Sequence, residues 1–224
     1  MKRVLLIIML LWNIFGCHGA APEDWANRAR YAQANNELSQ SVDSNRVVLM
    51  GNSITEFWEE LRPDFFVTQH LVGRGISGQV SSQMLARFRQ DVINLWPRIV
   101  VINCGTNDIA ENNGEYDEEI TMDNIKSMTE LAQAHGIIVM LSSVLPADRF
   151  IWNTRVKDAA QKIQHLNRRI SDYCERNHIG YIDYYSPMAT PGGALIPAYS
   201  EDGVHPNAAG YEVMEKVLTD ALKK

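Results

Sequence analysis

Short apolar segments alternate with longer amphipathic segments along most of this chain, and this alternation limits the possible folds more than any other feature. The apolar segments are typical of buried strands and lie at 46–50, 68–72, 98–104, 137–144 and 179–184. The amphipathic segments are expected to be helices, at 23–40, from 53 onward, at 79–94, 118–134 and 157–177, and from 208 to about 222. Strands that alternate with helices favour a parallel sheet covered on both faces. We therefore predict an α/β fold with a five-stranded parallel sheet.

The first residues have the composition of an export signal. Two basic residues at 2–3 precede an apolar core at 4–15, and small residues follow it. The core is shorter than the roughly 20 apolar residues that a membrane-spanning helix needs. We therefore interpret residues 1–19 as a signal peptide.

Two processing routes are consistent with this leader. Signal peptidase could cleave after Gly19, where small residues precede the site. Alternatively, Cys17 could be lipidated, because residues 14–17 (Ile-Phe-Gly-Cys) resemble a loose lipoprotein cleavage site. Either route predicts an exported protein, which would be periplasmic, secreted or lipid-anchored at a bacterial cell envelope.

The remaining residues, 20–224, suit one domain with a single core, and no linker or repeat divides them. The chain has 27 acidic against 21 basic residues and a net charge of −6. Because no run of Lys or Arg stands out, nucleic acid is not an expected partner. No pair of histidines has ligand spacing, and Cys104 and Cys174 are far apart, so we expect no metal site and two buried thiols.

A carboxylate and a histidine near the end of the chain indicate the chemistry. Asp202 precedes His205 by three residues, in the segment Asp-Gly-Val-His-Pro-Asn. At this spacing a carboxylate can hold one imidazole nitrogen and leave the other free to act as a base. Taken separately, Asp202 could form an Asx turn and His205 could be an ordinary surface residue.

Ser53 is the candidate nucleophile, because it directly follows the first predicted strand. A serine hydroxyl is a weak nucleophile until a nearby base removes its proton, and His205 is the candidate base. In parallel sheets, ligands bind at the carboxyl ends of the strands, where both residues are expected. The alternative for Ser53 alone is a helix N-cap. Together with Asp202, these residues predict a Ser-His-Asp hydrolase.

Acyl transfer also requires hydrogen-bond donors for the negative oxygen that forms on the attacked carbonyl. Three candidates follow the first three predicted strands: the backbone N–H of Ser53, the backbone N–H of Gly78 and the side-chain amide of Asn107. The alternatives are an ordinary turn glycine for Gly78 and a turn or cap residue for Asn107.

Four short segments together resemble the SGNH hydrolases, also called the GDSL lipase/esterase family. In the family's order they are 51–54 (GNSI), 75–78 (GISG), 105–108 (GTND) and 202–207 (DGVHPN). The resemblance implies a three-layer α/β/α sandwich similar to flavodoxin, and no cofactor. It also implies a catalytic triad of Ser53, Asp202 and His205. The oxyanion hole would then consist of Ser53, Gly78 and Asn107.

The chain looks most like exported bacterial relatives of platelet-activating factor acetylhydrolase. This resemblance implies a serine esterase for short acyl groups such as acetyl, with a small-molecule or carbohydrate ester as substrate. A lipid acylhydrolase of the lysophospholipase or thioesterase type is the alternative. Arg149 and Trp152 are candidate substrate-binding residues, because they follow a predicted strand in a partly apolar loop. Acyl length, the alcohol group and the oligomeric state stay open.

Two positions depart from the family's usual residues. Asn52 stands where many members have Asp, and its side chain can still hydrogen-bond within the turn. Gly73 stands where many relatives have Asn, which we expect to loosen the turn that holds Gly78.

Two other classes of protein fit the sequence less well. Residues 73–78 fit the dinucleotide-binding pattern G-x-G-x-x-G, but they follow the second predicted strand rather than the first. The acidic residue near the required distance, Asp91, also falls inside a predicted helix. A non-catalytic carbohydrate-binding protein on the same fold is disfavoured because Ser53, Asp202 and His205 are all present.

Overall fold

The fold is that of an α/β protein with a single parallel sheet. The computed structural model describes residues 24–41 and 43–223. Five strands pair in the order β2-β1-β3-β4-β5, and all four pairings are parallel. The strands are β1 (Val47–Gly51), β2 (Leu71–Gly75), β3 (Ile99–Ile102), β4 (Ile138–Ser142) and β5 (Gly180–Ile182). The prediction of a five-stranded parallel sheet is confirmed.

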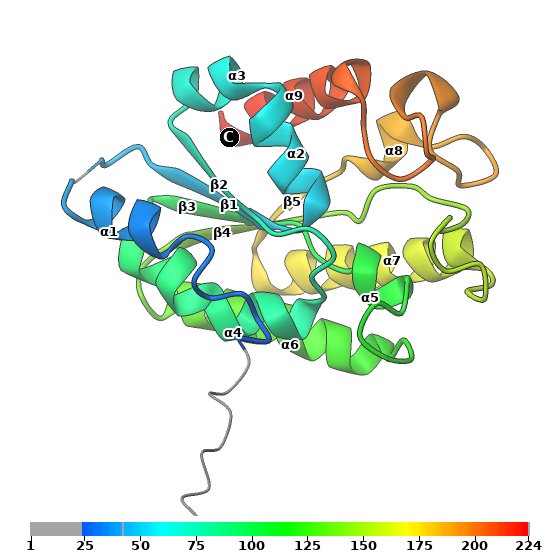
Figure 1. Ribbon diagram of the computed structural model, residues 1–224, viewed down its shortest axis with the longest axis horizontal. Coiled ribbons are helices and arrows are strands. Elements are labelled where there is room, and N and C mark those ends of the chain that lie inside the picture. The colour runs from blue at the N-terminus through cyan, green and yellow to red at the C-terminus, as the bar shows by residue number, and fades with distance from the viewer. Residues whose placement is uncertain (1–23, 42, 224) are drawn as a thin grey trace, which may run out of the picture.

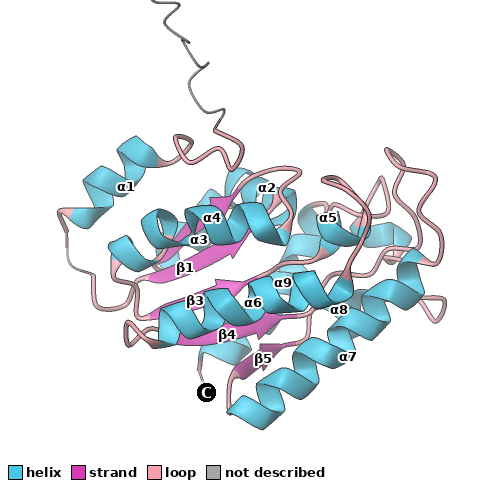
Figure 2. Cartoon of the chain, turned by 90° about the horizontal axis from the view of Figure 1, so that it is seen from below, coloured by secondary structure: helices cyan, strands magenta, loops and turns pink. Residues whose placement is uncertain are grey.

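Helices cover both faces of the sheet and complete a three-layer sandwich. Figure 1 shows α2 (Ser53–Leu61), α3 (Pro63–Thr68) and α9 (Ala208–Leu222) on one face. The other face carries α4 (Ser81–Asp91), α6 (Glu118–Gln133) and α7 (Ala159–Asn177), as the view from below in Figure 2 also shows. The shorter helices are α1 (Ala32–Ser39), α5 (Thr106–Ile109), α8 (Tyr185–Met188) and the 3-10 turns Ile93–Leu95 and Pro197–Tyr199.

The strands are apolar on both faces because each face has its own core. In β1, Val48 and Met50 belong to one hydrophobic cluster, which includes Phe88 of α4. Val47 and Leu49 face the other cluster, under α2 and α9. Alternate side chains of a strand point to opposite faces, so an uninterrupted apolar strand fits a sheet buried between two helical layers.

The second strand lies later in the chain than predicted. Residues 63–68 form helix α3, and β2 begins only at Leu71. Pro63 occupies the start of this helix, where its missing N–H costs no hydrogen bond. The ring of Phe66 packs edge-on against the ring of Trp58, with 5.8 Å between the ring centroids. Tertiary packing therefore favours a helix in this segment, although its residues are of strand type. Gly73 consequently lies inside β2, paired with Leu49, and not in the turn that holds Gly78.

The predicted helix at 23–40 is also shorter, since only Ala32–Ser39 is helical. Side chains of α4 and of the loop before α4 bind the backbone of residues 25–26, in the segment that precedes α1. Gln83 donates to the carbonyl of Trp25, and Gln79 donates to the carbonyl of Ala26. These carbonyls therefore have partners without a helix, and the Trp25 side chain is 48% exposed.

Three expectations concern the signal peptide, membrane-spanning helices and the two thiols. The predicted signal peptide, residues 1–19, lies outside the described residues, and so does Cys17. Within 24–41 and 43–223, no helix has the length and apolar character needed to cross a membrane. Cys104 and Cys174 are both free and buried, and burial raises the pKa of the Cys174 thiol to about 12.

Candidate active site

Ser53 is the first residue of α2, close to the carboxyl end of β1, an interior strand of the sheet. The preceding residue, Asn52, caps this helix, because its side-chain oxygen accepts a hydrogen bond from the N–H of Ile54 at 3.1 Å. The Ser53 hydroxyl is therefore not needed as a cap. Its Oγ lies 2.9 Å from Nε2 of His205.

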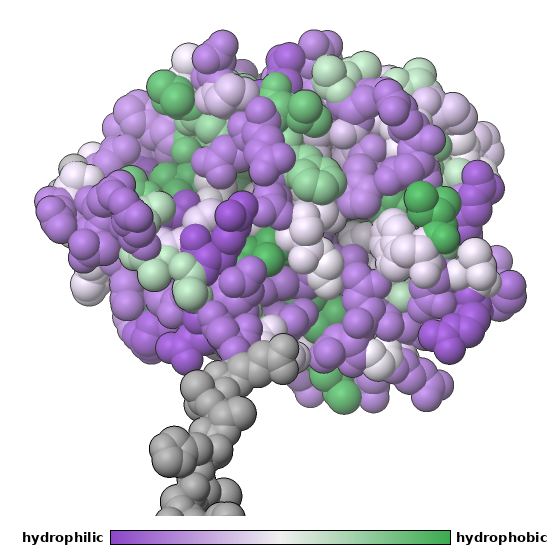
Figure 3. Space-filling view, in the orientation of Figure 1, coloured by the Kyte–Doolittle hydropathy of each residue, from purple (hydrophilic) through white to green (hydrophobic). Residues whose placement is uncertain are grey.

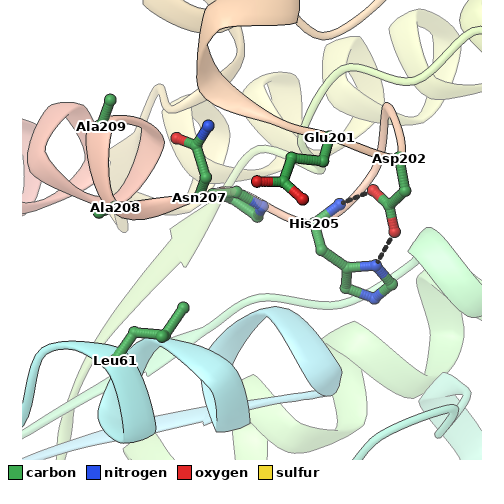
Figure 4. Close-up of a pocket in the computed structure, with 8 residues that line it drawn as sticks. Leu61, Glu201, Asp202, His205, Asn207, Ala208 and Ala209 are labelled. Carbon is green, nitrogen blue, oxygen red and sulfur yellow. Dashed lines mark hydrogen bonds and ion pairs between the residues drawn. The ribbon is translucent and has the colours of Figure 1, made fainter.

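Asp202 serves its own turn and the His205 ring at the same time. Its Oδ1 accepts hydrogen bonds from the backbone N–H groups of Val204 and His205, both at 2.8 Å. Its Oδ2 lies 2.6 Å from Nδ1 of His205, and Figure 4 shows this carboxylate between the ring and the backbone N–H of His205. The same carboxylate therefore forms the Asx turn and holds the histidine ring.

Burial alone would raise the pKa of the Asp202 carboxyl, because leaving water disfavours the charged form. The hydrogen bonds from the His205 ring and from the backbone N–H groups of His205 and Val204 outweigh this effect. They lower the pKa of Asp202 to about 2. An ionised carboxylate only accepts hydrogen bonds, so Nδ1 of His205 must carry a hydrogen. In a neutral ring, Nε2 is then free to accept the proton of Ser53.

Two aromatic rings hold the imidazole from other elements. The ring of Phe57, on α2, lies 5.3 Å from the His205 ring between centroids. The ring of Trp152, in the segment between β4 and α7, lies 6.0 Å from it. Packing on both rings restricts the orientation of the imidazole, which a general base needs.

Gly78 and Asn107 follow β2 and β3, the two strands that flank β1. Gly78 has a φ of +77°, a left-handed conformation that favours glycine. Asn107 is buried, and its Nδ2 donates to the carbonyl oxygen of Gln79 at 3.0 Å. An amide nitrogen carries two hydrogens, so this contact uses only one N–H of Asn107 and leaves the other available as a donor.

A buried arginine, which sequence reasoning missed, ties together the strand ends that carry these residues. Nη2 of Arg87 donates to the carbonyl of Gly51 at 2.9 Å and to that of Arg74 at 3.0 Å, in β1 and β2 respectively. Nη1 pairs with Asp91 at 2.8 Å, and both side chains are almost completely buried. The spacing of Arg87 and Asp91 on one turn of a predicted helix was the available signal.

Two hollows flank the linked Ser53, His205 and Asp202. One, of about 650 Å³, is drawn in Figure 4 and is lined by Leu61, Glu201, Asp202, His205 and the segment 206–209. The other, of about 630 Å³, is lined by Gly78, Glu111, Asn112, Trp152, Asn153, Thr154 and Arg155. Both hollows therefore adjoin residues of the candidate site.

The two predicted substrate-binding residues differ in position. Trp152 lines the second hollow and packs beside His205. The Arg149 side chain is largely exposed, 3.7 Å from Asp148, and lines neither hollow. Arg155 lines the second hollow instead. Asn112 also lines the second hollow. Sequence reasoning missed this residue, because it lies in a polar loop that carries no distinguishing pattern.

No cluster of three or more His, Cys, Asp or Glu side chains suited to a metal ion is present in the part of the chain that the structure describes. The half-buried carboxylate of Asp108 has a structural environment. It accepts hydrogen bonds from the backbone N–H of Ser81, at the start of α4, at 3.0 Å. Burial raises the pKa of Asp108, although the hydrogen bonds from Ser81 oppose this effect.

A parallel α/β sandwich with linked Ser53, His205 and Asp202 at its carboxyl edge has the architecture of a serine hydrolase. The sequence model of the GDSL-like lipase/acylhydrolase family matches residues 49–213, which include every one of these side chains. The chain belongs to this family.

Comparisons with individual proteins agree with this membership. An acetylxylan esterase from Xylanibacter ruminicola is 24% identical over 216 residues, covering 81% of this chain. The chain spans only 44% of that relative's length. The solved structure of a GDSL-like lipase from Bacteroides thetaiotaomicron is 54% identical and has a TM-score of 0.86, covering 88% of this chain and 98% of the other. An acetylxylan esterase from Geobacillus stearothermophilus, 16% identical with a TM-score of 0.65 over 81% and 95% of the two chains, shares the fold.

Proposed function

We propose that this protein is an exported serine esterase that hydrolyses carboxylic esters of short acyl groups, acetyl above all. The observation that carries the proposal is the hydrogen-bonded series from Ser53 through His205 to Asp202. The Ser53–His205 distance suits proton transfer from a nucleophile to a base, and the His205–Asp202 distance suits a carboxylate that orients this base.

In the proposed reaction, Nε2 of His205 takes the proton of Ser53 as Oγ attacks the ester carbonyl carbon. The carbonyl oxygen becomes negative and accepts hydrogen bonds from the backbone N–H groups of Ser53 and Gly78 and from Asn107. His205 then gives the proton to the departing alcohol, which leaves the acyl group on Ser53. Water, activated by the same ring, attacks the acyl carbon and releases the acid.

The preference for short acyl groups rests on the surface around the site. A site for long acyl chains is expected to expose a large apolar patch. Leu61 and Trp152, two exposed hydrophobic residues near the site, line different hollows, and the face shown in Figure 3 is mostly hydrophilic. Trp152 beside amide and charged side chains suits a sugar ring, and acetylxylan esterases are among the relatives. Arg149 stays a second, untested candidate for contact with substrate.

One observation favours the alternative, a lysophospholipase or thioesterase type of lipid acylhydrolase. Leu61 is 57% exposed and, with Ala208 and Ala209, forms an apolar wall in the hollow beside His205. A short lipid chain could lie against this wall.

A chain-length series of p-nitrophenyl esters, from acetate to palmitate, distinguishes these functions. We expect turnover of acetate and butyrate that disappears in S53A and persists in S127A, a control serine on the exposed side of α6. Turnover of long chains would favour the lipid alternative. If S53A and the parent chain hydrolysed acetate equally, the proposal would be wrong.

Export rests on the composition of residues 1–19 and has its own test. We expect the mature protein to begin at Ala20, or at a lipid-modified Cys17, when the full chain is produced in a bacterial host. Intact mass of the protein recovered from envelope and medium separates the two routes. An unprocessed chain retained in the cytoplasm would contradict export.

A further inference from the structure

Asn112 connects three parts of the candidate site that lie far apart in sequence. Its Nδ2 donates to Oδ1 of Asn107 at 2.9 Å and to the carbonyl oxygen of Gly78 at 3.2 Å. Its Oδ1 accepts a hydrogen bond from Nε1 of Trp152, also at 2.9 Å. One amide thus touches two members of the predicted oxyanion hole and the indole that packs beside His205.

These contacts have a direction, and Trp152 sets it. An indole N–H only donates, so the group that faces it must be the oxygen of the Asn112 amide. The nitrogen of Asn112 then faces Asn107 and must meet the Asn107 oxygen. The Asn107 nitrogen consequently points the other way, toward the carbonyl of Gln79 and the place of the reacting oxygen.

The reverse orientation of the Asn107 amide would be harmful to catalysis. It would bring the Asn107 oxygen against the carbonyl oxygen of Gln79 and against the negative oxygen of the intermediate, where two acceptors repel. The carbonyl of Gln79 opposes this orientation from one side of the amide, and a donor that faces the Asn107 oxygen opposes it from the other. A donor held opposite that oxygen therefore helps to fix which end of the amide faces the reaction.

We propose that Asn112 and Trp152 are positioning residues that hold the Asn107 amide with its N–H toward the oxyanion. The inference rests on the proposed function, since it assumes that Asn107 is an oxyanion donor. Trp152 has a second property that fits this role, because it lines the hollow next to Gly78. A substrate seated there excludes water from the Trp152–Asn112 hydrogen bond, which strengthens the bond when it is needed.

A double-mutant cycle tests whether Asn112 and Trp152 act through Asn107. The variants are N107A, N112A and W152F, the last of which keeps an aromatic ring and removes the indole N–H together with part of the ring. We expect N107A to lower kcat by about 10²–10³-fold, as for one oxyanion donor. N112A and W152F should each lower kcat by a smaller factor, and N112A should change KM little.

The decisive result is the effect of the second substitution. In an N107A background, N112A should cause no further loss of kcat, and W152F should cause a smaller loss than in the parent chain, because only its packing on His205 then matters. Losses that multiply, or a W152F variant with unchanged kcat, would overturn the proposal. W96F is the matched control, because Trp96 is 71% exposed and precedes β3 at the opposite end of the sheet. Should N112A fail to fold in a thermal unfolding assay, W152F and W152F/N107A still decide.

The same experiment separates this inference from the proposed function. Wild-type kcat in N107A would overturn the positioning role, while the assignment of Ser53 depends on S53A alone.

Discussion

The hydroxyl oxygen of Ser53 lies 2.9 Å from Nε2 of His205, although the two residues are 152 positions apart in the chain. Ser53 starts the helix after β1, and His205 lies in the segment that returns to the same sheet edge after β5. The two helices that follow them are joined as well, because the Tyr211 hydroxyl on α9 donates to the carbonyl of Ile54 on α2 at 2.9 Å. The parallel sheet and this helix contact bring nucleophile and base together.

Replacing the carboxylate of Asp202 tests its role in orienting His205. An asparagine keeps an oxygen for the backbone N–H groups of Val204 and His205, so D202N should fold. Its amide N–H can face Nδ1, which favours the wrong tautomer of the ring. We expect kcat to fall by about 10⁴-fold with little change in KM. S200A, which removes only the Ser200 hydroxyl beside the same carboxylate, should retain most activity. Comparable losses in both variants would contradict this account.

The low pKa of Asp202 predicts a dependence of stability on pH. Its pKa of about 2 in the folded protein lies below the ordinary value of 3.8, so folding favours the ionised form. The resulting stabilisation is fully present above about pH 4 and is lost as the pH falls toward about 2. The free energy of unfolding in urea should therefore fall less steeply over this range in D202N than in the parent chain. Parallel curves would show that Asp202 contributes no such stabilisation.

Substitutions of two glycines distinguish the effect of backbone strain on stability from an effect on catalysis. Gly78 and Gly136 have φ of +77° and +72°, and a methyl group at either position would meet no close neighbour. An alanine at either position should cost roughly 1–2 kcal/mol in unfolding free energy because of the left-handed backbone. Only G78A should also lower kcat, since relief of the strain moves the N–H of residue 78. Equal activity in G78A and G136A would remove Gly78 from the oxyanion hole.

Two buried tyrosines differ in whether their hydroxyls have a partner. The Tyr211 hydroxyl donates to Ile54, whereas the hydroxyl of buried Tyr184 has no hydrogen-bond partner among the described residues. We expect Y211F to destabilise the protein by about 0.5–1.5 kcal/mol, because it removes a buried hydrogen bond between α9 and α2. Y184F should be neutral or stabilising. Chemical unfolding of the two variants measures the difference, and a larger loss in Y184F would contradict the assigned contacts.

The sheet and its order of elements could be predicted because buried parallel strands are apolar on both faces and leave a clear pattern. The boundaries were less predictable where tertiary contacts override local preference. Residues 63–68 are helical because Phe66 packs on Trp58, and the segment around Trp25 is irregular because α4 and its loop bind its carbonyls. Neither contact has a local signature in the sequence.

Within the candidate site, short motifs in the sequence indicate the reacting residues, but no motif indicates the residues that position them. Asp202 and His205 share one turn, so their spacing alone suggests the hydrogen bond. Asn112 and Arg87 act through partners between 5 and 40 positions away, which only the fold brings into contact. Arg149 lies in the same predicted loop as Trp152, but a position in a loop does not specify which way a side chain points.

The most direct test of the central claim is the identity of the acylated residue. The mature protein would be mixed with p-nitrophenyl acetate, quenched in acid during the first turnover, digested and analysed by peptide mass spectrometry. We predict a mass increase of one acetyl group on Ser53, and none at that position in S53A. Rapid hydrolysis with the acetyl group on a different residue, or with Ser53 never labelled, would contradict the proposal that Ser53 is the nucleophile.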